Sequence, residues 1–232
     1  MIYQQRVKAI KTEEAAKTAM NKRFADLELK ALQAQMNPHF IFNALTAVQS
    51  FILNKDTHAA NDYLTKFSKL MRQSLEASRR KFIPLEDEID MLNNYIALEQ
   101  VRFVDKFDFK CVVGANVDMG IEIPSMLLQP FIENAINHGI LYKEGFGHLT
   151  LTFSKDDEAL QCIIEDDGVG RKEAARRQAQ SLKPHVSRAT QIMEERVVML
   201  QEVEDVSVRI LIIDKVDEGN KGEGTKVIVN IV

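Results

Sequence analysis

The sequence predicts a chain that is helical in its first part and mixed α+β in its second, with the change near Arg102–Asp105. Up to that point, apolar residues recur every three or four positions, which is the period of an amphipathic helix. After Phe107 the period becomes two, which is typical of strands, and turns separate the runs. We therefore expect three units, covering residues 1–36, 37–104 and 105–232.

The composition is that of a globular protein, because 45% of the 232 residues are hydrophobic and 28% are charged. A formal net charge of −4 gives no overall basic surface, so we expect no direct nucleic-acid binding. Cys111 and Cys162 lie far apart and lack a metal-like spacing, which predicts buried thiols in a reducing compartment. No run approaches the ~20 apolar residues of a membrane helix. We expect the chain as given to be soluble and cytoplasmic.

Residues 1–36 predict one long helix, because they are charged, contain no Gly or Pro, and are rich in Ala, Lys, Glu and Gln. Apolar residues follow a 4,3 spacing in two stretches, but polar residues interrupt it between them. The helix is either exposed and single or part of a two-stranded coiled coil, which we favour as a signalling element. A polar helix of this length at the first residue suggests a chain cut just after another module.

Residues 38–54 and 57–80 predict two helices joined by a short turn, with Asp56 or Thr57 as the N-cap of the second. Each helix carries a wide apolar stripe, formed by Ile41, Leu45, Val48, Phe51 and Ile52 in the first and by Ala60, Tyr63, Leu64, Phe67, Leu70, Met71 and Leu75 in the second. A lone hairpin cannot bury both stripes, so we expect a homodimer that forms a four-helix bundle. Pro84 opens a third helix, roughly 85–103, with an acidic first turn.

A histidine follows a proline at the start of the first hairpin helix, within Gln35-Met36-Asn37-Pro38-His39-Phe40-Ile41-Phe42-Asn43. Proline is tolerated in the first turn of a helix, which places His39 near the start and Asn43 one turn later on the same face. A neutral imidazole can act as a nucleophile. Taken alone, such a histidine is more often a capping or packing residue, but the rest of the chain favours a functional role.

The second part predicts strands at 107–113, 148–154, 159–165, 206–213 and 226–232, and helices that begin at Pro124 and cover 189–204. The segment 171–187 has little apolar content and no clear period. Late in the Pro124 helix, Asn134, Asn137 and His138 are spaced i, i+3 and i+4, so they project from one face. An amide oxygen can complete a Mg²⁺ shell beside phosphate oxygens, although a polar helix end is the simpler interpretation of these residues alone.

Two glycine motifs lie next to predicted strands: the first directly follows a strand, and the second precedes one. Asp166-Asp167-Gly168-Val169-Gly170 comes directly after a strand, where glycines let the backbone approach a ligand and a carboxylate can accept from an exocyclic amino group. Gly222-Glu223-Gly224-Thr225 precedes the last strand and can offer backbone N–H groups and a hydroxyl to phosphate. Each motif alone is also compatible with a flexible turn, and neither is a Walker loop.

The order and spacing of these signals resemble the ATP-binding domain shared by gyrase-type ATPases and histidine kinases, the Bergerat fold. Together with NPHFIFN and with LLQPFIENAINHG, they make the chain resemble the cytoplasmic half of a LytS/YehU-type sensor histidine kinase over about residues 24–232. The resemblance implies a coiled coil, a dimeric bundle and a Bergerat-type α/β sandwich.

The resemblance also implies roles for individual residues. His39 would be the phosphoacceptor, Asn43 a candidate for orienting water in the reverse phosphatase reaction, and Asn134 the Mg²⁺ ligand. The residues implied to bind ATP are Asn134, Asn137, His138, Asp166, Gly168, Gly170, Ser187, Arg188, Gly222, Gly224 and Thr225. Residues 171–187 would be a mobile lid over ATP, whose far edge has Ser187 and Arg188 where the family often has glycines.

The implied cofactors are ATP and Mg²⁺. The implied partners are a second copy of the chain and a response regulator, expected to be a LytTR-type DNA-binding protein, which receives the phosphoryl group on an aspartate. An upstream membrane sensor domain, missing from this chain, would anchor the full-length protein in the cytoplasmic membrane. Two alternatives stay open: a catalytically degraded dimeric scaffold, and an ATPase or serine kinase of the same fold.

Overall fold

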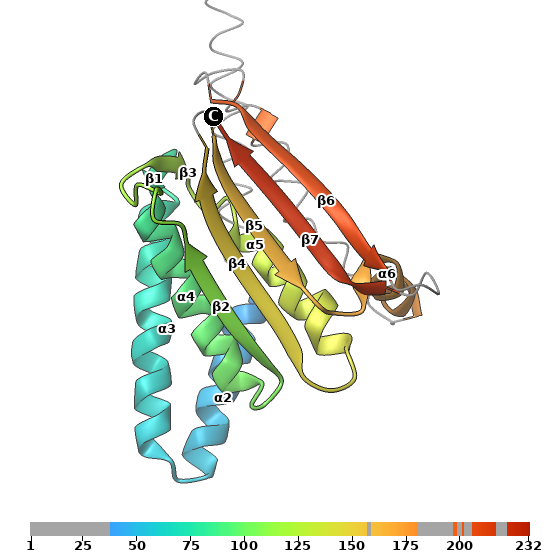
Figure 1. The fold of residues 1–232 in the computed structure, drawn as a ribbon. Helices are drawn as coiled ribbons and strands as arrows, with labels where there is room; N and C mark the ends of the chain where they lie inside the picture. Colours follow the sequence, from blue (N-terminus) through green and yellow to red (C-terminus); the bar gives the residue numbers. More distant parts are fainter. Residues whose placement is uncertain (1–37, 157–158, 181–196, 199–200, 202–205, 217–221) are drawn as a thin grey trace, which may run out of the picture.

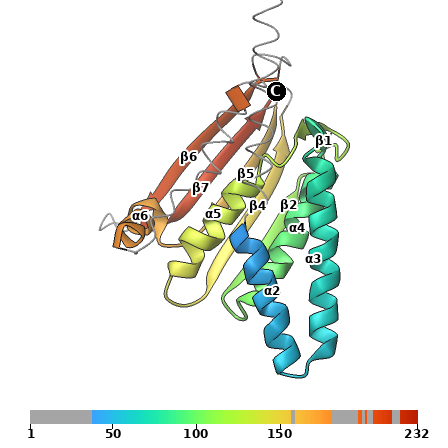
Figure 2. The same ribbon diagram turned by 180° about the vertical axis from the view of Figure 1, so that it is seen from behind.

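A computed structural model describes residues 38–156, 159–180, 197–198, 201, 206–216 and 222–232. The predicted coiled coil of residues 1–36 and most of the predicted helix 189–204 lie outside these residues. The described part is an α/β arrangement in which helices cover one face of a sheet (Figures 1 and 2).

The centre of the fold is a five-stranded sheet in the order β2-β4-β5-β7-β6. Its strands are β2 (Phe107–Val113), β4 (Gly147–Lys155), β5 (Leu160–Asp166), β6 (Val208–Val216) and β7 (Gly222–Ile231). Strand β2 runs parallel to β4, and the other pairs are antiparallel. Alternation of apolar residues gives the sheet one buried face, on which α4 (Leu85–Arg102) and α5 (Gln129–Asn134) pack (Figure 2), while none of the described helices covers the opposite face (Figure 1).

The two hairpin helices are α2 (Pro38–Leu53) and α3 (Thr57–Ala77), and they lie beside α4 (Figure 1). The predicted N-cap is confirmed, because the Asp56 side chain accepts a hydrogen bond from the Ala59 backbone N–H at 2.9 Å. The residues that face the core are Phe40, Ala44, Ala47, Val48 and Phe51 on α2, and Ala60, Tyr63, Phe67, Leu70 and Ala77 on α3. Part of each predicted stripe therefore stays exposed, namely Leu45, Ile52, Leu64 and Leu75, together with Phe42 and Leu53.

The predicted helix start at Pro124 is wrong. Pro124 ends a short strand, β3 (Glu122–Pro124), which pairs with β1 (Phe82–Pro84), and the helix begins only at Gln129. The turn between them is held by the buried Glu88 carboxylate, which accepts the backbone N–H groups of Met126 at 2.8 Å and Leu128 at 2.9 Å. A buried backbone N–H needs a partner, and Glu88 supplies it in place of a first helical turn.

Helix α5 continues into a π-helical turn, η1 (Ala135–Gly139), and a 3-10 turn, η2 (Ile140–Tyr142). The predicted lid segment is not irregular at its start, since α6 (Gly170–Gln180) covers its first residues. None of the helices in the described part of the chain is long and apolar enough to cross a membrane.

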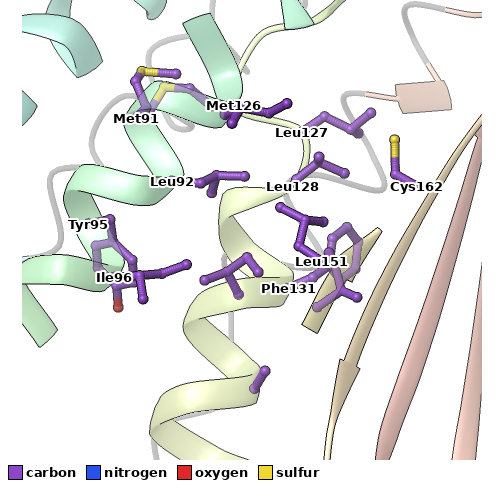
Figure 3. Packing of buried hydrophobic residues seen from close by; sticks show 14 of the residues in the cluster. Met91, Leu92, Tyr95, Ile96, Met126, Leu127, Leu128, Phe131, Leu151 and Cys162 are labelled. Carbon is purple, nitrogen blue, oxygen red and sulfur yellow. The ribbon is translucent and has the colours of Figure 1, made fainter. Parts of the chain in front are cut away.

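The buried hydrophobic residues form one continuous core that runs from the hairpin through α4 and α5 to the sheet. Figure 3 shows Leu92 and Ile96 from α4 and Phe131 from α5 packed toward Leu151 of β4. Helix α4, which falls in the predicted unit 37–104, thus shares its core with the sheet of the following unit. The boundary at residue 104 stays a prediction.

Candidate functional site

The most deeply buried ionisable side chain of the glycine motifs is Asp166, the last residue of β5, which is only 3% exposed. Its Oδ1 atom accepts the backbone N–H of Gly168 at 2.8 Å, and the backbone N–H of Thr225 also donates to the carboxylate. Burial raises the pKa of Asp166 to about 6, although these two N–H groups and the charge of Lys215 act in the opposite direction. The result is a fixed, desolvated carboxyl group with further acceptor capacity.

Three segments that are distant in the sequence meet at this carboxyl group. Gly139, which ends η1, lies so close that a Cβ atom there would stand 2.8 Å from Asp166 Oδ1. A Cβ atom on Gly168 would overlap the Gly139 backbone, and one on Gly224 would overlap the Asp166 carbonyl oxygen. Gly224 also has a φ of +115°, a conformation that residues with side chains rarely adopt. The glycines are therefore required by the close approach of three backbones.

Ion pairs surround the junction, by which we mean the place where Gly139, Gly168 and Gly224 meet at Asp166. Lys215 Nζ on β6 donates to Glu165 Oε1 at 2.8 Å and to the Asp166 carbonyl oxygen at 3.3 Å. The side chain of Asp167 binds a different set of groups. It pairs with Lys143 at 2.7 Å and accepts the His148 backbone N–H at 2.7 Å. The two adjacent aspartates thus differ in role, with Asp166 inside and Asp167 on the rim.

The predicted polar face of α5 and η1 is partly buried at Asn134, Asn137 and His138. The side chain of Asn137 shares a hydrogen bond with Tyr95 of α4. Beside Asn134 stands Glu133, whose pKa is raised to about 7 by burial, against the effect of the Gln129 hydrogen bond and with a further contribution from the charge of Glu99. This face therefore borders both the junction around Asp166 and the interface with α4.

Helix α6 starts at Gly170, directly after the first glycine motif, and is tied to both sides of the junction. Arg171 makes two hydrogen bonds to Asp214 of β6, at 2.7 and 3.0 Å. Arg177 Nη1 donates to the Tyr142 carbonyl oxygen at 2.7 Å. The first residues of the predicted lid are thus anchored, while Ser187 and Arg188 lie outside the described residues.

The structure places His39 in the first turn of α2, as predicted, and Asn43 one turn later, partly buried. Sequence reasoning missed Lys215, Lys143 and Tyr95, because each acts through a contact with a distant segment. The close approach of the backbones at Gly139 was also not predicted from the sequence.

The junction fits an adenine nucleotide in one respect, because Asp166 offers a buried acceptor suited to an amino group. Among the described residues, no group of three or more His, Cys, Asp or Glu side chains could hold a metal ion. An amide oxygen at Asn134 could join phosphate oxygens and waters in a Mg²⁺ shell.

Comparisons with known proteins find sensor histidine kinases. The model of the histidine kinase family matches residues 27–107. The chain is 35% identical over 150 residues to the sensor protein LytS of Bacillus subtilis, a match that covers 65% of this chain and 25% of that protein. It is 38% identical over 144 residues to the sensor histidine kinase YpdA of Escherichia coli, covering 62% of this chain and 25% of that protein. The chain thus spans about a quarter of the length of these relatives.

Among solved structures, the histidine kinase domain of a blue-light activated histidine kinase from Erythrobacter litoralis aligns with a TM-score of 0.45 and 16% identity. The alignment covers 90% of this chain and 94% of that one.

Proposed function

Because the chain belongs to the LytS-type sensor histidine kinases, we propose that it is the part of such a kinase that binds Mg-ATP and phosphorylates His39. The observation that carries this proposal is the meeting of three glycine-containing segments around the buried carboxyl group of Asp166. A site built to accept an N–H group rejects ligands that lack it, so Asp166 would select adenine.

We assign the other predicted residues to parts of the ATP site around Asp166. Gly168 and Gly170 would shape the pocket for the adenine base. Gly222, Gly224 and Thr225 would lie at the end of the site that binds the phosphates of ATP. Asn134 would hold Mg²⁺, with Asn137 and His138 nearby. Ser187 and Arg188 would complete the lid. Positioning and electrostatic stabilisation supply most of the catalysis in phosphoryl transfer, which is the task that these polar groups can perform.

His39 would act as the nucleophile through a neutral imidazole nitrogen. When bound, Mg-ATP would supply the phosphoryl group, whose bond to ADP breaks as the bond to nitrogen forms. Asn43, one turn further along α2, is our candidate for orienting water in the reverse, phosphatase reaction.

We further propose that the protein is a homodimer that passes the phosphoryl group to an aspartate of a LytTR-type response regulator. The exposed apolar side chains of the hairpin support the dimer, since a second copy would bury them in a four-helix bundle. In the full-length protein, this part would lie in the cytoplasm behind a membrane sensor domain.

Incubation with γ-labelled ATP and Mg²⁺ tests the central step. The wild-type chain should acquire label that is lost in acid and kept in base, as expected for phosphohistidine. His39→Gln should abolish labelling while the Kd for ATP changes by less than about threefold. His58→Gln, at an exposed histidine of α3, is the matched control and should label like the wild type.

The alternatives give different outcomes in the same assay. Label that survives acid and is lost in base would indicate a serine kinase, and ATP turnover without label would indicate a simple ATPase. A chain that does not bind ATP would be a scaffold. Retention of acid-labile label in His39→Gln would contradict the assignment of His39.

A further inference from the structure

Tyr95 of α4 lies between two functional elements. One is α2, which carries His39, and the other is α5 with its turn η1, which carries residues predicted to bind ATP. It is 3% exposed, and its ring centroid is 5.3 Å from that of Phe40, with the planes inclined at 41°. Phe40 directly follows His39 in the sequence and also packs against Phe67 of α3, with the ring centroids 6.0 Å apart. The Tyr95 ring is therefore part of the surface on which the start of α2 rests.

The hydroxyl end of the same side chain reaches the other element. It shares a hydrogen bond with the side chain of Asn137, on the π-helical turn η1. Burial raises the pKa of Tyr95 well above its usual value, and the charges of Glu133 and Glu99 raise it further. The hydroxyl consequently stays protonated and can keep this hydrogen bond at any physiological pH.

From Asn137, the contacts continue to the predicted nucleotide site within a few residues. The η1 turn ends at Gly139, whose carbonyl oxygen accepts the Val169 backbone N–H at 3.2 Å and whose Cα lies against Gly168 and Asp166. Isolated π-helical turns inside α-helices are frequent at functional sites, because they displace a side chain from the regular helical spacing. Here the turn contains Asn137, the residue that Tyr95 binds.

We propose that Tyr95 is a positioning residue that couples the helix of the phosphoacceptor to the nucleotide-binding helix, through its ring on Phe40 and its hydroxyl on Asn137. This inference rests on the proposed function, and it goes beyond it by naming a residue outside the predicted ATP-binding and phosphoacceptor residues. Displacements of about 1 Å at a reacting centre can cost 10²-fold in rate, so a side chain that fixes both helices controls the transfer step.

A second buried tyrosine provides the control. Tyr63 of α3 is also almost fully buried, and its ring centroid is 5.9 Å from that of Phe51 on α2. Its hydroxyl has no hydrogen-bond partner among the described residues. Replacement by phenylalanine thus removes the same atom at both positions, but it breaks the link to the nucleotide helix only at Tyr95.

The experiment compares the wild type, Tyr95→Phe and Tyr63→Phe in the full 232-residue chain. Two quantities are measured: the rate constant of autophosphorylation at saturating Mg-ATP, and the Kd for Mg-ATP. For Tyr95→Phe we expect the rate constant to fall by about tenfold and the Kd to change by less than about threefold, because the positioning of bound reactants is lost. Tyr63→Phe should match the wild type in both.

A second readout does not need phosphorylation. Hydrogen exchange of the α2 backbone amides is measured with and without Mg²⁺ and a non-hydrolysable ATP analogue. The coupling predicts that the analogue changes exchange in α2 by about fivefold or more in the wild type and in Tyr63→Phe, but not in Tyr95→Phe. A melting curve of each variant confirms that it is folded.

The inference is overturned if Tyr95→Phe autophosphorylates at the wild-type rate, or if the analogue changes α2 exchange equally in Tyr95→Phe and the wild type. It is also overturned if the Kd rises as much as the rate falls, because Tyr95 would then only support the nucleotide site. Failure of the proposed function is distinct, since the wild type itself would then show neither label nor nucleotide binding.

Discussion

Asp166→Asn separates the functional role of the buried carboxyl group from its effect on stability. The amide has almost the same shape, and its oxygen can still accept the Gly168 N–H that Oδ1 accepts at 2.8 Å. Its NH₂ group, however, replaces an acceptor by a donor. An adenine amino group would then face another donor, so we expect the Kd for Mg-ATP to rise by at least about 10²-fold.

The same substitution should weaken ATP binding but stabilise the fold at neutral pH, because the buried Asp166 carboxyl group is costly to ionise. Its pKa is raised to about 6 from 3.8, so the unfolded chain releases this proton first as the pH rises. The free energy of unfolding should therefore fall between about pH 4 and 6, by up to about 3 kcal/mol in total. The asparagine does not titrate, so this slope should vanish in the variant.

At pH 7 the variant should be more stable than the wild type by about 1–2 kcal/mol, because one lost acceptor offsets part of that gain. Urea unfolding at several pH values measures the free energy, and calorimetry with Mg-ATP measures the Kd. A variant that binds Mg-ATP like the wild type, or that keeps the pH slope, would refute this account of Asp166.

The adjacent Asp167 is the matched control. Burial acts to raise its pKa, but hydrogen bonds from Lys143 and the His148 backbone, with the charges of both side chains, lower it overall. Its contribution to stability is therefore present above the unfolded pKa and is lost as the pH falls below about 4. Asp167→Asn should reduce stability at pH 7 by about 0.5–1 kcal/mol, since the ion pair is partly exposed, and should leave the Kd unchanged.

Three further predictions concern the turn before α5, the glycine junction and the hairpin. Glu88→Ala leaves two buried backbone N–H groups without their acceptor and should lower the free energy of urea unfolding by about 2–5 kcal/mol. Gly224→Ala should abolish ATP binding in calorimetry, whereas Gly145→Ala, also at positive φ but with open space around its Cβ, should only lower stability by about 1 kcal/mol. Leu45→Glu should shift the dimer to monomer in sedimentation, whereas Leu211→Glu on the open sheet face should not, although both leucines are 54% exposed.

Local patterns were sufficient to predict the five strands of the central sheet. Strand β5 alternates strictly from Leu160, so Asp166 falls on the same face as Cys162 and Ile164, while Asp167 lies beyond the last strand residue. The glycine motifs were likewise recognisable, because a backbone that must approach another backbone excludes side chains. These features depend on neighbours in the sequence.

Features that depend on distant partners could not be predicted. The start of α5 is delayed to Gln129 because Glu88, about 40 residues earlier, binds the turn before it. The first part of segment 171–187 has no apolar period, yet it is helical and is held by Arg171 on Asp214 and by Arg177 on the Tyr142 carbonyl. A surface helix fixed by charged contacts to other elements leaves little signal in its own hydrophobic pattern.

The contacts of α4 indicate where the predicted ATP site and His39 could move relative to each other. The strand β1 before α4 pairs with β3, and Glu88 within α4 holds the turn before α5, so the start of α4 is tied to the sheet side by hydrogen bonds. Toward the hairpin, α4 contributes apolar packing, including the Phe40–Tyr95 ring contact, and the side-chain hydrogen bond from Asn94 to Gln73 at 2.8 Å. Ring contacts can re-form after a small shift, whereas buried backbone hydrogen bonds cannot be given up cheaply. This contrast favours α4 staying with the sheet side in any movement, so the Phe40–Tyr95 contact is the point at which Tyr95 would hold α2 in the reactive arrangement.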